Sequence, residues 1–291
     1  MRDARILLTG HTGFIGAALF ARLQKTHQHI YTLSRRELQD IPGEKKGERI
    51  RAKMEAIKPD LIIHAATFFS SRHPPLPDSM APMLEANVFL GNALMQAAVE
   101  CGCLKFLNLG SFWEKLAKND PKFATLYSLQ KRHITETLKM YAARSDLHVI
   151  NLLLCDTYGP NDPRGKILSV LLQKAKTGEN IALGSKQQLL SFVHVDDVVD
   201  ALILCLEEVM RPVIPGYTEY GLRAETLMPM KTVVEEIEAL AQKQLNVTWL
   251  SDAPQYDAQE LFRNIKVPPG WRQRVDFAEG LQQLLDRFPS S

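Results

Sequence analysis

Short apolar runs alternate with amphipathic stretches through the first half of the chain. Five runs are short and bounded by breakers, as buried strands are; they cover residues 5–9, 29–33, 61–65, 105–109 and 149–154. The stretches between them place apolar residues at helical spacing, over residues 14–25, 48–57, 86–100 and 124–143. This regular alternation predicts an α/β fold with a doubly wound parallel sheet that helices cover on both faces. Ligands are then expected beyond the carboxyl ends of the strands.

The alternation weakens after about residue 156, where proline and glycine recur around the amphipathic stretches 231–244 and 277–288. We therefore predict a main domain over residues 1–155, to which a strand and a helix return at residues 192–210. A smaller C-terminal α/β lobe is predicted to comprise residues 156–191 and 211–291 and to bind the substrate.

The charge of the chain is nearly balanced, since 35 Lys and Arg residues oppose 33 Asp and Glu residues for a formal net charge of +2. A field that would gather nucleic acid or an anionic membrane is not expected. The four cysteines have neither disulfide-framework nor metal-site spacing, so no metal is expected. The N-terminus lacks the apolar core of a signal peptide and no apolar run has membrane-spanning length, which predicts a cytoplasmic protein.

A glycine-rich turn joins the first expected strand to the first expected helix. Glycines let a chain turn sharply and let backbone N–H groups approach a pyrophosphate, to which the helix N-terminus adds partial positive charge. Such a turn can also be glycine-rich for steric reasons alone. The flanking strand and helix favour a dinucleotide site, whose residues in this turn are Gly10, Thr12, Gly13, Phe14, Ile15 and Gly16.

The end of the second expected strand indicates which dinucleotide binds. NAD-binding proteins usually carry an acidic side chain there for the ribose hydroxyls, whereas this chain has Ser34 followed by Arg35 and Arg36. Guanidinium groups can hold a 2′-phosphate through paired, charged hydrogen bonds. The pattern favours NADP(H); the alternative is that both arginines only solvate the strand end.

The G-x-x-G-x-x-G spacing resembles the extended branch of the short-chain dehydrogenase/reductases, the NAD-dependent epimerase/dehydratase family, which has a Rossmann-type fold. A Tyr127-x-x-x-Lys131 pair and Ser111, just beyond the expected strand 105–109, stand where that family has its catalytic groups. Four residues make about one helical turn, so Tyr127 and Lys131 share a helix face. A phenol titrates near pH ~10 in water and needs a nearby cation for acid-base work at neutral pH, which Lys131 would supply.

The resemblance implies roles for these residues and adds others. Tyr127 would exchange a proton with the substrate oxygen, Ser111 would hydrogen-bond that oxygen, and Lys131 would also hold the nicotinamide ribose. Further cofactor-binding positions are Ala65, Ala66, Thr67 and Asn87, and Asn87 could equally be a helix cap. The substrate-binding positions are Thr67, Ser111, Phe112, Asp156, Arg164 and Lys166.

One departure from the family concerns the nucleotide diphosphate. Leu190 stands where relatives have an arginine that often grips this group. Either other basic residues hold it, with Arg164, Lys166, Lys186 and Arg263 as candidates, or the substrate is not a typical nucleotide sugar.

The residues after Ser111 help to choose the reaction. Phe112 and Trp113 occupy the positions where 4,6-dehydratases of the family have an acidic pair, and Glu114 comes one place too late, which argues against dehydration. Residues 110–115 and 215–220 resemble bacterial nucleotide-sugar 4-ketoreductases, such as those that make CDP-abequose for lipopolysaccharide O-antigen. The resemblance implies NADPH-dependent reduction of a nucleoside-diphosphate 4-keto-6-deoxy sugar by a homodimer. The alternatives are an NAD(P)-dependent epimerase and a non-catalytic NADP-sensing regulator on the same fold.

Overall fold

The computed structural model describes residues 2–69, 77–212 and 215–286. The chain divides into two compact units. Unit 1 comprises Met1–Leu154, Val199–Gly221 and Pro268–Gly270; unit 2 comprises Cys155–Val198, Leu222–Val267 and Trp271–Ser291. Among the described residues, no helix has both the length and the apolar character needed to span a lipid bilayer.

Unit 1 is built on a six-stranded sheet in the order β10-β5-β4-β3-β1-β2. Its strands are β1 (Arg5–Thr9), β2 (His29–Leu33), β3 (Leu61–His64), β4 (Lys105–Ser111), β5 (His148–Leu154) and β10 (Gly216–Leu222). Strand β1 pairs in parallel with β2 and β3, and β4 pairs in parallel with β3 and β5. The predicted doubly wound parallel sheet is confirmed. Because the strand order reverses at β1, the carboxyl ends of β1 and β3 form the switch point where such sheets bind ligands.

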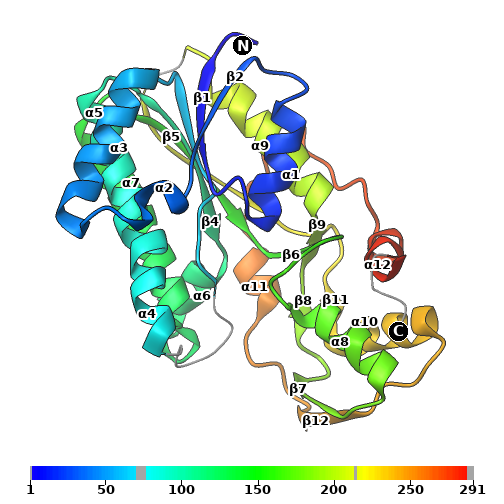
Figure 1. Cartoon of the computed structure of the whole chain (residues 1–291). Coiled ribbons are helices and arrows are strands. Elements are labelled where there is room, and N and C mark those ends of the chain that lie inside the picture. The colour runs from blue at the N-terminus through cyan, green and yellow to red at the C-terminus, as the bar shows by residue number, and fades with distance from the viewer. Residues whose placement is uncertain (1, 70–76, 213–214, 287–291) are drawn as a thin grey trace. The chain divides into compact units, whose positions relative to one another are not determined.

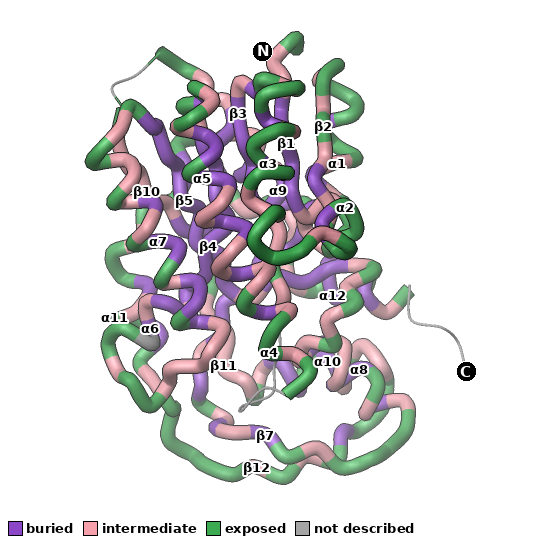
Figure 2. The backbone as a smooth tube through the Cα atoms, turned by 60° about the vertical axis from the view of Figure 1, so that its left-hand side comes forward, coloured by how far each residue is buried: buried purple, intermediate pink, exposed green. Residues whose placement is uncertain are grey.

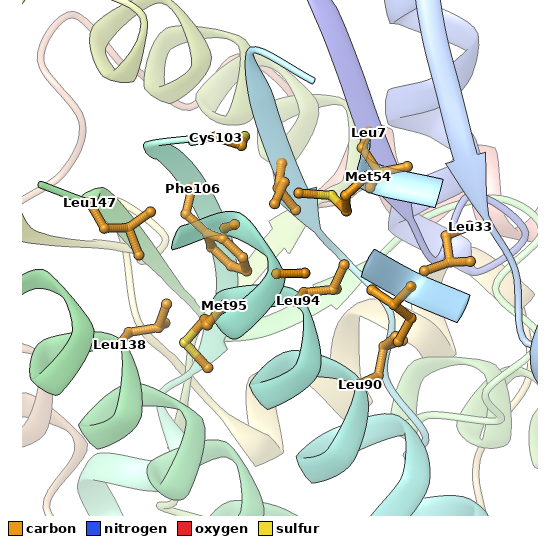
Figure 3. Close-up of a cluster of buried hydrophobic side chains, with 14 of the residues drawn as sticks. Leu7, Leu33, Met54, Leu90, Leu94, Met95, Cys103, Phe106, Leu138 and Leu147 are labelled. Atoms are coloured by element: carbon orange, nitrogen blue, oxygen red, sulfur yellow. The ribbon is translucent and has the colours of Figure 1, made fainter. Parts of the chain in front are cut away.

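Helices cover both faces of this sheet (Figure 1). On one face lie α3 (Gly43–Ile57), α5 (Leu90–Glu100) and α7 (Leu126–Arg144); on the other lie α1 (Phe14–Leu23) and the later part of α9 (Val195–Val209). The Arg22 guanidinium forms an ion pair with Asp200 at 3.0 Å and joins the last two helices. Figure 3 shows the core of the first face, where Met54, Leu94 and Phe106 belong to one buried cluster. The apolar stripe of each helix therefore packs on strands that are buried through their length.

Shorter helices follow the strand ends of unit 1. They are α2 (Arg36–Gln39), α4 (Pro77–Leu84), the π-helical stretch η1 (Glu85–Phe89), α6 (Trp113–Asn119) and the 3₁₀ turn η2 (Pro121–Phe123). The expected helix 86–100 is longer than predicted, because α4, η1 and α5 follow one another without a break from residue 77.

Two strands pair differently from the expectation. Residues 192–210 were expected to return to the main sheet, but β9 (Phe192–His194) pairs in parallel with β6 (Asp156–Tyr158) in a separate two-stranded sheet. Strand β10 lies instead in the six-stranded sheet beside β5, although its residues were expected in the C-terminal lobe. A short apolar run predicts that a strand forms, but its partner depends on contacts far away in the sequence.

Unit 2 packs three helices around its own apolar core. These are α8 (Ile167–Thr177), α10 (Met230–Ala241) and α12 (Phe277–Asp286), and their buried residues include Leu171, Val233 and Leu281. The helix expected at 277–288 is described as far as residue 286; its last two positions lie outside the described residues.

The remaining elements of unit 2 are short. They are β7 (Ile181–Ser185), β8 (Leu189–Leu190), β11 (Met228–Pro229), β12 (Val247–Ser251) and α11 (Ala258–Phe262). Strand β12 pairs in parallel with β7, and β11 pairs antiparallel with β8. Figure 2 shows β12 largely exposed, in contrast to the buried central strands of unit 1.

Candidate active site

The glycine turn closes tightly at the end of β1. Gly10 has a φ of +76°, and a Cβ there would lie 2.5 Å from the backbone nitrogen of Ala66. The N–H of Gly13 donates to the Gly10 carbonyl over 2.9 Å, and a Cβ on Gly16 would lie 2.0 Å from the same oxygen. Side chains at positions 10 and 16 would therefore collide with backbone atoms, so the turn brings the ends of β1 and β3 together only with glycine.

Helix α1 begins directly after this turn. Among the described residues, no side chain caps its N-terminus, where Gly13 is the capping residue. The first N–H groups of a helix and its dipole suit an anion such as a pyrophosphate. Thr12, Phe14 and Ile15 lie in the turn and the first helical residues, and their contact with a cofactor stays a prediction.

A buried histidine ties the ends of β1 and β3 together. Thr9 Oγ1 lies 2.8 Å from His64 Nδ1 and accepts a hydrogen bond from the N–H of Ala66 over 3.3 Å. Burial lowers the pKa of His64 to about 3, and the charge of Lys131 adds to the effect. The imidazole is thus neutral at physiological pH, and Ala65 and Ala66 are placed beside Gly10.

Asn87, in the π-helical stretch η1, fastens the segment that follows β3. Its Oδ1 accepts from Thr67 Oγ1 (2.9 Å) and from the N–H of Phe68 (2.7 Å). Its Nδ2 donates to the Phe68 carbonyl (2.8 Å) and to Gln130 Oε1 (2.9 Å). An amide has two donor hydrogens and two acceptor lone pairs, so these four bonds use its full capacity. We expect Asn87 to act on a cofactor through the position of Thr67 rather than by contact.

A carboxylate that was not among the expected site residues, Glu37, lies at the end of β2. Glu37 Oε1 accepts from the N–H of Ser34 over 2.8 Å and from its hydroxyl over 3.2 Å. Partial burial would raise the pKa of Glu37, but its hydrogen bonds with Lys53 and Ser34 outweigh this effect, so the pKa is lowered. Arg35 and Arg36 are exposed, and neither forms an ion pair with a described residue. Two exposed cationic side chains and one carboxylate therefore follow the end of β2.

Lys131 is a charged residue in the interior of unit 1. Its side chain is buried, and Nζ donates to the carbonyl of Leu109 in β4 over 2.9 Å. Burial lowers the pKa of Lys131 to about 8, while the carboxylate of Glu114 acts in the opposite direction. The bond to Leu109 holds α7 against β4 two residues before Ser111, the last residue of that strand.

Tyr127 lies one helical turn before Lys131 on α7 and therefore on the same face. Its ring packs edge-on against Phe69, with ring centroids 5.3 Å apart. A capping box starts the helix just before it: Thr125 Oγ1 accepts from the N–H of Ser128, whose hydroxyl accepts from the N–H of Thr125. The start of α7 is thereby fixed near Tyr127.

Ser111 and Phe112 end β4 and start α6, and both are buried. The Ser111 hydroxyl oxygen accepts from the N–H of Trp113 over 3.3 Å, and the N–H of Phe112 donates to the Leu154 carbonyl over 3.0 Å. Ser111 thus stands at the carboxyl end of its strand, next to the β4 segment that Lys131 contacts. Lys131 and Ser111 are thus placed at the carboxyl end of β4, and Tyr127 lies one helical turn before Lys131.

An acid whose burial was not expected acts on Lys131. Glu114, on the first turn of α6, is 2% exposed, and the Thr135 hydroxyl lies 2.9 and 3.0 Å from its two carboxyl oxygens. The sequence contains one signal for this environment. Tyr127, Lys131 and Thr135 recur every fourth residue, so Thr135, which contacts Glu114, shares a face of α7 with the two expected catalytic groups.

The expected substrate-binding residues Asp156, Arg164 and Lys166 lie in unit 2. Arg164 donates to Asp162 through Nε and Nη2, both over 2.6 Å, and to the carbonyl and hydroxyl of Thr157 over 3.1 Å. Burial raises the pKa of Asp156 and lowers that of Lys166, and each charge partly offsets the shift of the other. Arg164 is thus held by the fold, whereas Asp156 and Lys166 form an opposed pair of charges.

Comparisons with known proteins agree with this geometry. Residues 6–216 match the NAD dependent epimerase/dehydratase family. The CDP-abequose synthase of Salmonella typhimurium is 26% identical over 310 residues, which cover 97% of this chain and 98% of the relative. That of Yersinia pseudotuberculosis is 27% identical over 210 residues, covering 68% and 72% of the two chains. The solved structure of MoeE5 in complex with UDP-glucuronic acid and NAD superposes with a TM-score of 0.74 at 22% identity, covering 97% and 98%.

A glycine turn at the β1–β3 switch point, and a Tyr-Lys pair one helical turn apart whose lysine contacts β4, are features of an extended short-chain dehydrogenase/reductase. The chain belongs to the NAD dependent epimerase/dehydratase family and is an enzyme of that family.

Proposed function

We propose that this protein reduces a nucleoside-diphosphate 4-keto-6-deoxy sugar with NADPH. The observation that carries the proposal is the buried Lys131 ammonium, which Leu109 holds at the end of β4, beside Ser111 and one turn from Tyr127. A buried ammonium is costly unless the fold compensates for its lost hydration. A regulator that only bound a cofactor would have no need of a phenol at this place.

The side chains would divide the work as follows. The Tyr127 hydroxyl donates a proton to the sugar oxygen at C4, and the Ser111 hydroxyl donates a hydrogen bond to the same oxygen. The Lys131 ammonium stabilises the phenolate that Tyr127 becomes after it has given its proton. Phe112 is buried at the start of α6 and excludes water from this end of β4.

Residues of unit 1 fit a dinucleotide. The cradle between Gly10, Gly16 and Ala66 has no room for a Cβ, and α1 starts there without a side-chain cap from the described residues. When bound, the nicotinamide of NADPH would supply the hydride. Gly10, Gly13 and the start of α1 would hold the pyrophosphate, Arg35 and Arg36 the 2′-phosphate, and Lys131 the nicotinamide ribose.

In unit 2, Lys166 is the better candidate for binding the substrate diphosphate. The guanidinium of Arg164 is already bound to Asp162 and Thr157, which leaves it less able to move toward a ligand. Burial destabilises the Lys166 ammonium, and a bound diphosphate would add the negative charge that favours it. Relatives named CDP-abequose synthase and GDP-L-fucose synthase, and neighbours solved with UDP sugars, support a nucleotide-sugar substrate.

A homodimer is part of the proposal. Helix α7 exposes Leu129 and Met140, whose relative exposures are 47% and 44%, although both are apolar. Exposed apolar side chains along one helix suit a helix-to-helix contact with a second copy. Light scattering at micromolar concentration is expected to give twice the mass of the chain, and a monomeric mass would contradict it.

One observation favours a second candidate, an NAD-dependent nucleotide-sugar epimerase. The Glu37 carboxylate lies at the end of β2, where an acid that binds the ribose hydroxyls favours NAD over NADP. Such an enzyme would interconvert two sugars with no net change in its nicotinamide.

The deciding experiment incubates the protein with NADPH and a panel of nucleoside-diphosphate 4-keto-6-deoxy sugars while the absorbance of reduced nicotinamide is followed. A reductase consumes one NADPH for each keto sugar. If the protein instead converts a nucleotide sugar that has no keto group into its epimer, with no net oxidation of the nicotinamide, the epimerase hypothesis is correct and the reductase hypothesis is wrong.

A further inference from the structure

Glu114 is an acid buried at the centre of a polar network behind the expected catalytic groups. Burial raises its pKa to about 8, although the hydrogen bond from Thr135 and the charge of Lys115 act in the opposite direction. A carboxyl that is 2% exposed usually costs stability unless it has a task or a counter-charge.

Thr135 links Glu114 to the rest of the network. Asn151 Nδ2 donates to Thr135 Oγ1 over 3.1 Å, so the hydroxyl oxygen of Thr135 already accepts a bond. A hydroxyl has only one proton to give. Thr135 gives that proton to Glu114 Oε1, 2.9 Å away, and a hydrogen bond donated to a carboxyl oxygen favours the ionised carboxylate.

Asn151 itself is held from two sides. Its Oδ1 accepts from Asn108 Nδ2 over 2.7 Å, and its Nδ2 also donates to the Tyr217 hydroxyl over 3.0 Å. Tyr217 in turn donates to Glu219 over 2.7 Å, and Glu219 forms an ion pair with Lys115 at 2.6 Å. The amide that orients Thr135 is thus fixed by β4 and β10, so its direction does not depend on a ligand.

Two ammonium groups act on this carboxylate, Lys115 more strongly and Lys131 less strongly. Lys131 and Thr135 lie one turn apart on the same face of α7, and the charges of Lys131 and Glu114 act on each other. The other charged groups that act on the pair are Lys115 of α6, Glu219 of β10 and His64 of β3. His64 is neutral at working pH, and Lys115 and Glu219 pair with each other. Glu114 is the acid whose charge raises the pKa of Lys131.

We infer that Glu114 is a positioning residue that keeps the Lys131 ammonium protonated on the alkaline side of neutrality, with Thr135 and Asn151 as its supports. The inference rests on the proposed function in one respect: Lys131 is taken to assist Tyr127. As the pH rises, ionisation of Glu114 supplies a negative charge beside Lys131, and Lys131 then keeps its proton where an isolated buried ammonium would lose it.

The first test replaces Glu114→Gln, which retains an oxygen that accepts from Thr135 and removes only the charge. The alkaline limb of the kcat/KM profile for keto-sugar reduction is expected to move to lower pH by about one unit. Glu136→Gln is the matched control, because Glu136 is an exposed acid on α7, the helix that carries Lys131, and its replacement changes the net charge equally. The control should reproduce the wild-type profile.

A second readout does not need activity or cofactor. Competitive acetylation with acetic anhydride across pH, followed by mass spectrometry of the peptide that contains Lys131, reports the midpoint at which its amine becomes reactive. Glu114→Gln should lower this midpoint by about one unit, and Glu136→Gln should leave it unchanged. A midpoint equal in wild type and Glu114→Gln overturns the inference.

A third variant tests the support and covers the case in which Glu114→Gln does not fold. Thr135→Val removes the proton aimed at Glu114 and should move the Lys131 midpoint in the same direction, by less than a unit. Thr135→Ser keeps the hydroxyl and should restore it. If wild type reduces no keto sugar, the proposed function fails, while the acetylation midpoints still decide the role of Glu114.

Discussion

Two lysines, the buried Lys131 of unit 1 and the partly buried Lys166 of unit 2, differ in how the surrounding structure holds their charge. Burial lowers the pKa of each, and a carboxylate, Glu114 or Asp156, opposes that shift in each. Lys131 extends from the second turn of a helix of 19 residues and bonds to a strand carbonyl. Lys166 precedes α8, right after Gly165 at a φ of +60°.

This difference has a physical consequence. Regular elements hold Lys131 in one position before any ligand arrives, which suits a group that must stabilise a short-lived charge. A lysine at the end of a loop can adjust to a ligand, which suits binding. We therefore expect Lys131 to be needed for catalytic turnover and Lys166 to be needed for affinity toward the substrate.

The largest effect is expected for Tyr127→Phe, which removes the hydroxyl and leaves the ring packed against Phe69. General acid catalysis contributes roughly 10²–10⁴-fold, so kcat should fall by about that factor with cofactor affinity nearly unchanged. Steady-state kinetics and a fluorescence titration with NADPH measure the two quantities. Ser111→Ala should give a milder loss of kcat. Wild-type turnover by Tyr127→Phe would disprove the proton-donor role.

Lys131→Met should lower turnover and cofactor affinity together. The ammonium that stabilises the Tyr127 phenolate and holds the nicotinamide ribose is lost, so a fall in kcat of about 10²-fold is expected. The same two measurements apply. A change in kcat alone would separate Lys131 from the cofactor and limit its role to the proton transfer.

Arg35→Glu should change the preference between cofactors. It removes a partner of the 2′-phosphate and puts a like charge in its place, and a charged hydrogen bond is worth roughly 1.5–3 kcal/mol, so affinity for NADPH relative to NADH should fall about ten- to hundredfold. Glu37→Gln should act in the opposite direction, because it removes the negative charge at Ser34. Binding titrations that show a wild-type preference for NADH would reject the NADP(H) assignment.

Lys166→Met is expected to raise KM for the nucleotide sugar about tenfold with little change in kcat, since one charged contact to a diphosphate is lost. Arg164→Met is the companion variant. It should lower the melting temperature more than Lys166→Met does, because its bonds to Asp162 and Thr157 are internal to unit 2. If kcat fell with Lys166→Met and KM stayed constant, the contrast between the two lysines would be wrong.

The smallest effect concerns stability. The pKa of Glu114 is about 8 in the folded protein and near its ordinary value of 4.5 when unfolded. Between these values the folded state binds a proton that the unfolded state lacks, so this carboxyl destabilises the fold increasingly as the pH rises from 5 to 8. The melting temperature of Glu114→Gln relative to wild type should therefore increase over this range, on the order of a few degrees. A difference independent of pH would show that Glu114 titrates normally.

Much of unit 1 could be predicted from the sequence because its signals are local. The run Ile6 to Leu8 is buried on all sides and reads as a central strand from hydrophobicity alone. Gly10 and Gly16 follow from the steric demands of a strand-to-helix turn. The spacing of Tyr127 and Lys131 on one helix needs only the helical repeat, and the family resemblance follows from these same residues.

What the tertiary structure alone decided involves residues far apart in the chain. Glu114 looks like an ordinary charged residue at the start of a helix, yet its environment comes from Thr135, 21 positions away, and from the Asn151–Tyr217 bond, which spans 66 positions. The hydrogen bond between Glu37 and Ser34 is local in the sequence. Whether the Glu37 charge can act on a 2′-phosphate depends on the sheet, which places β2 at its edge. The strands with which β9 and β10 pair likewise lie far from them in the sequence. Apolar periodicity records which face of an element is buried, whereas hydrogen bonds between buried polar groups depend on directions and distances that exist only once the sheet has formed.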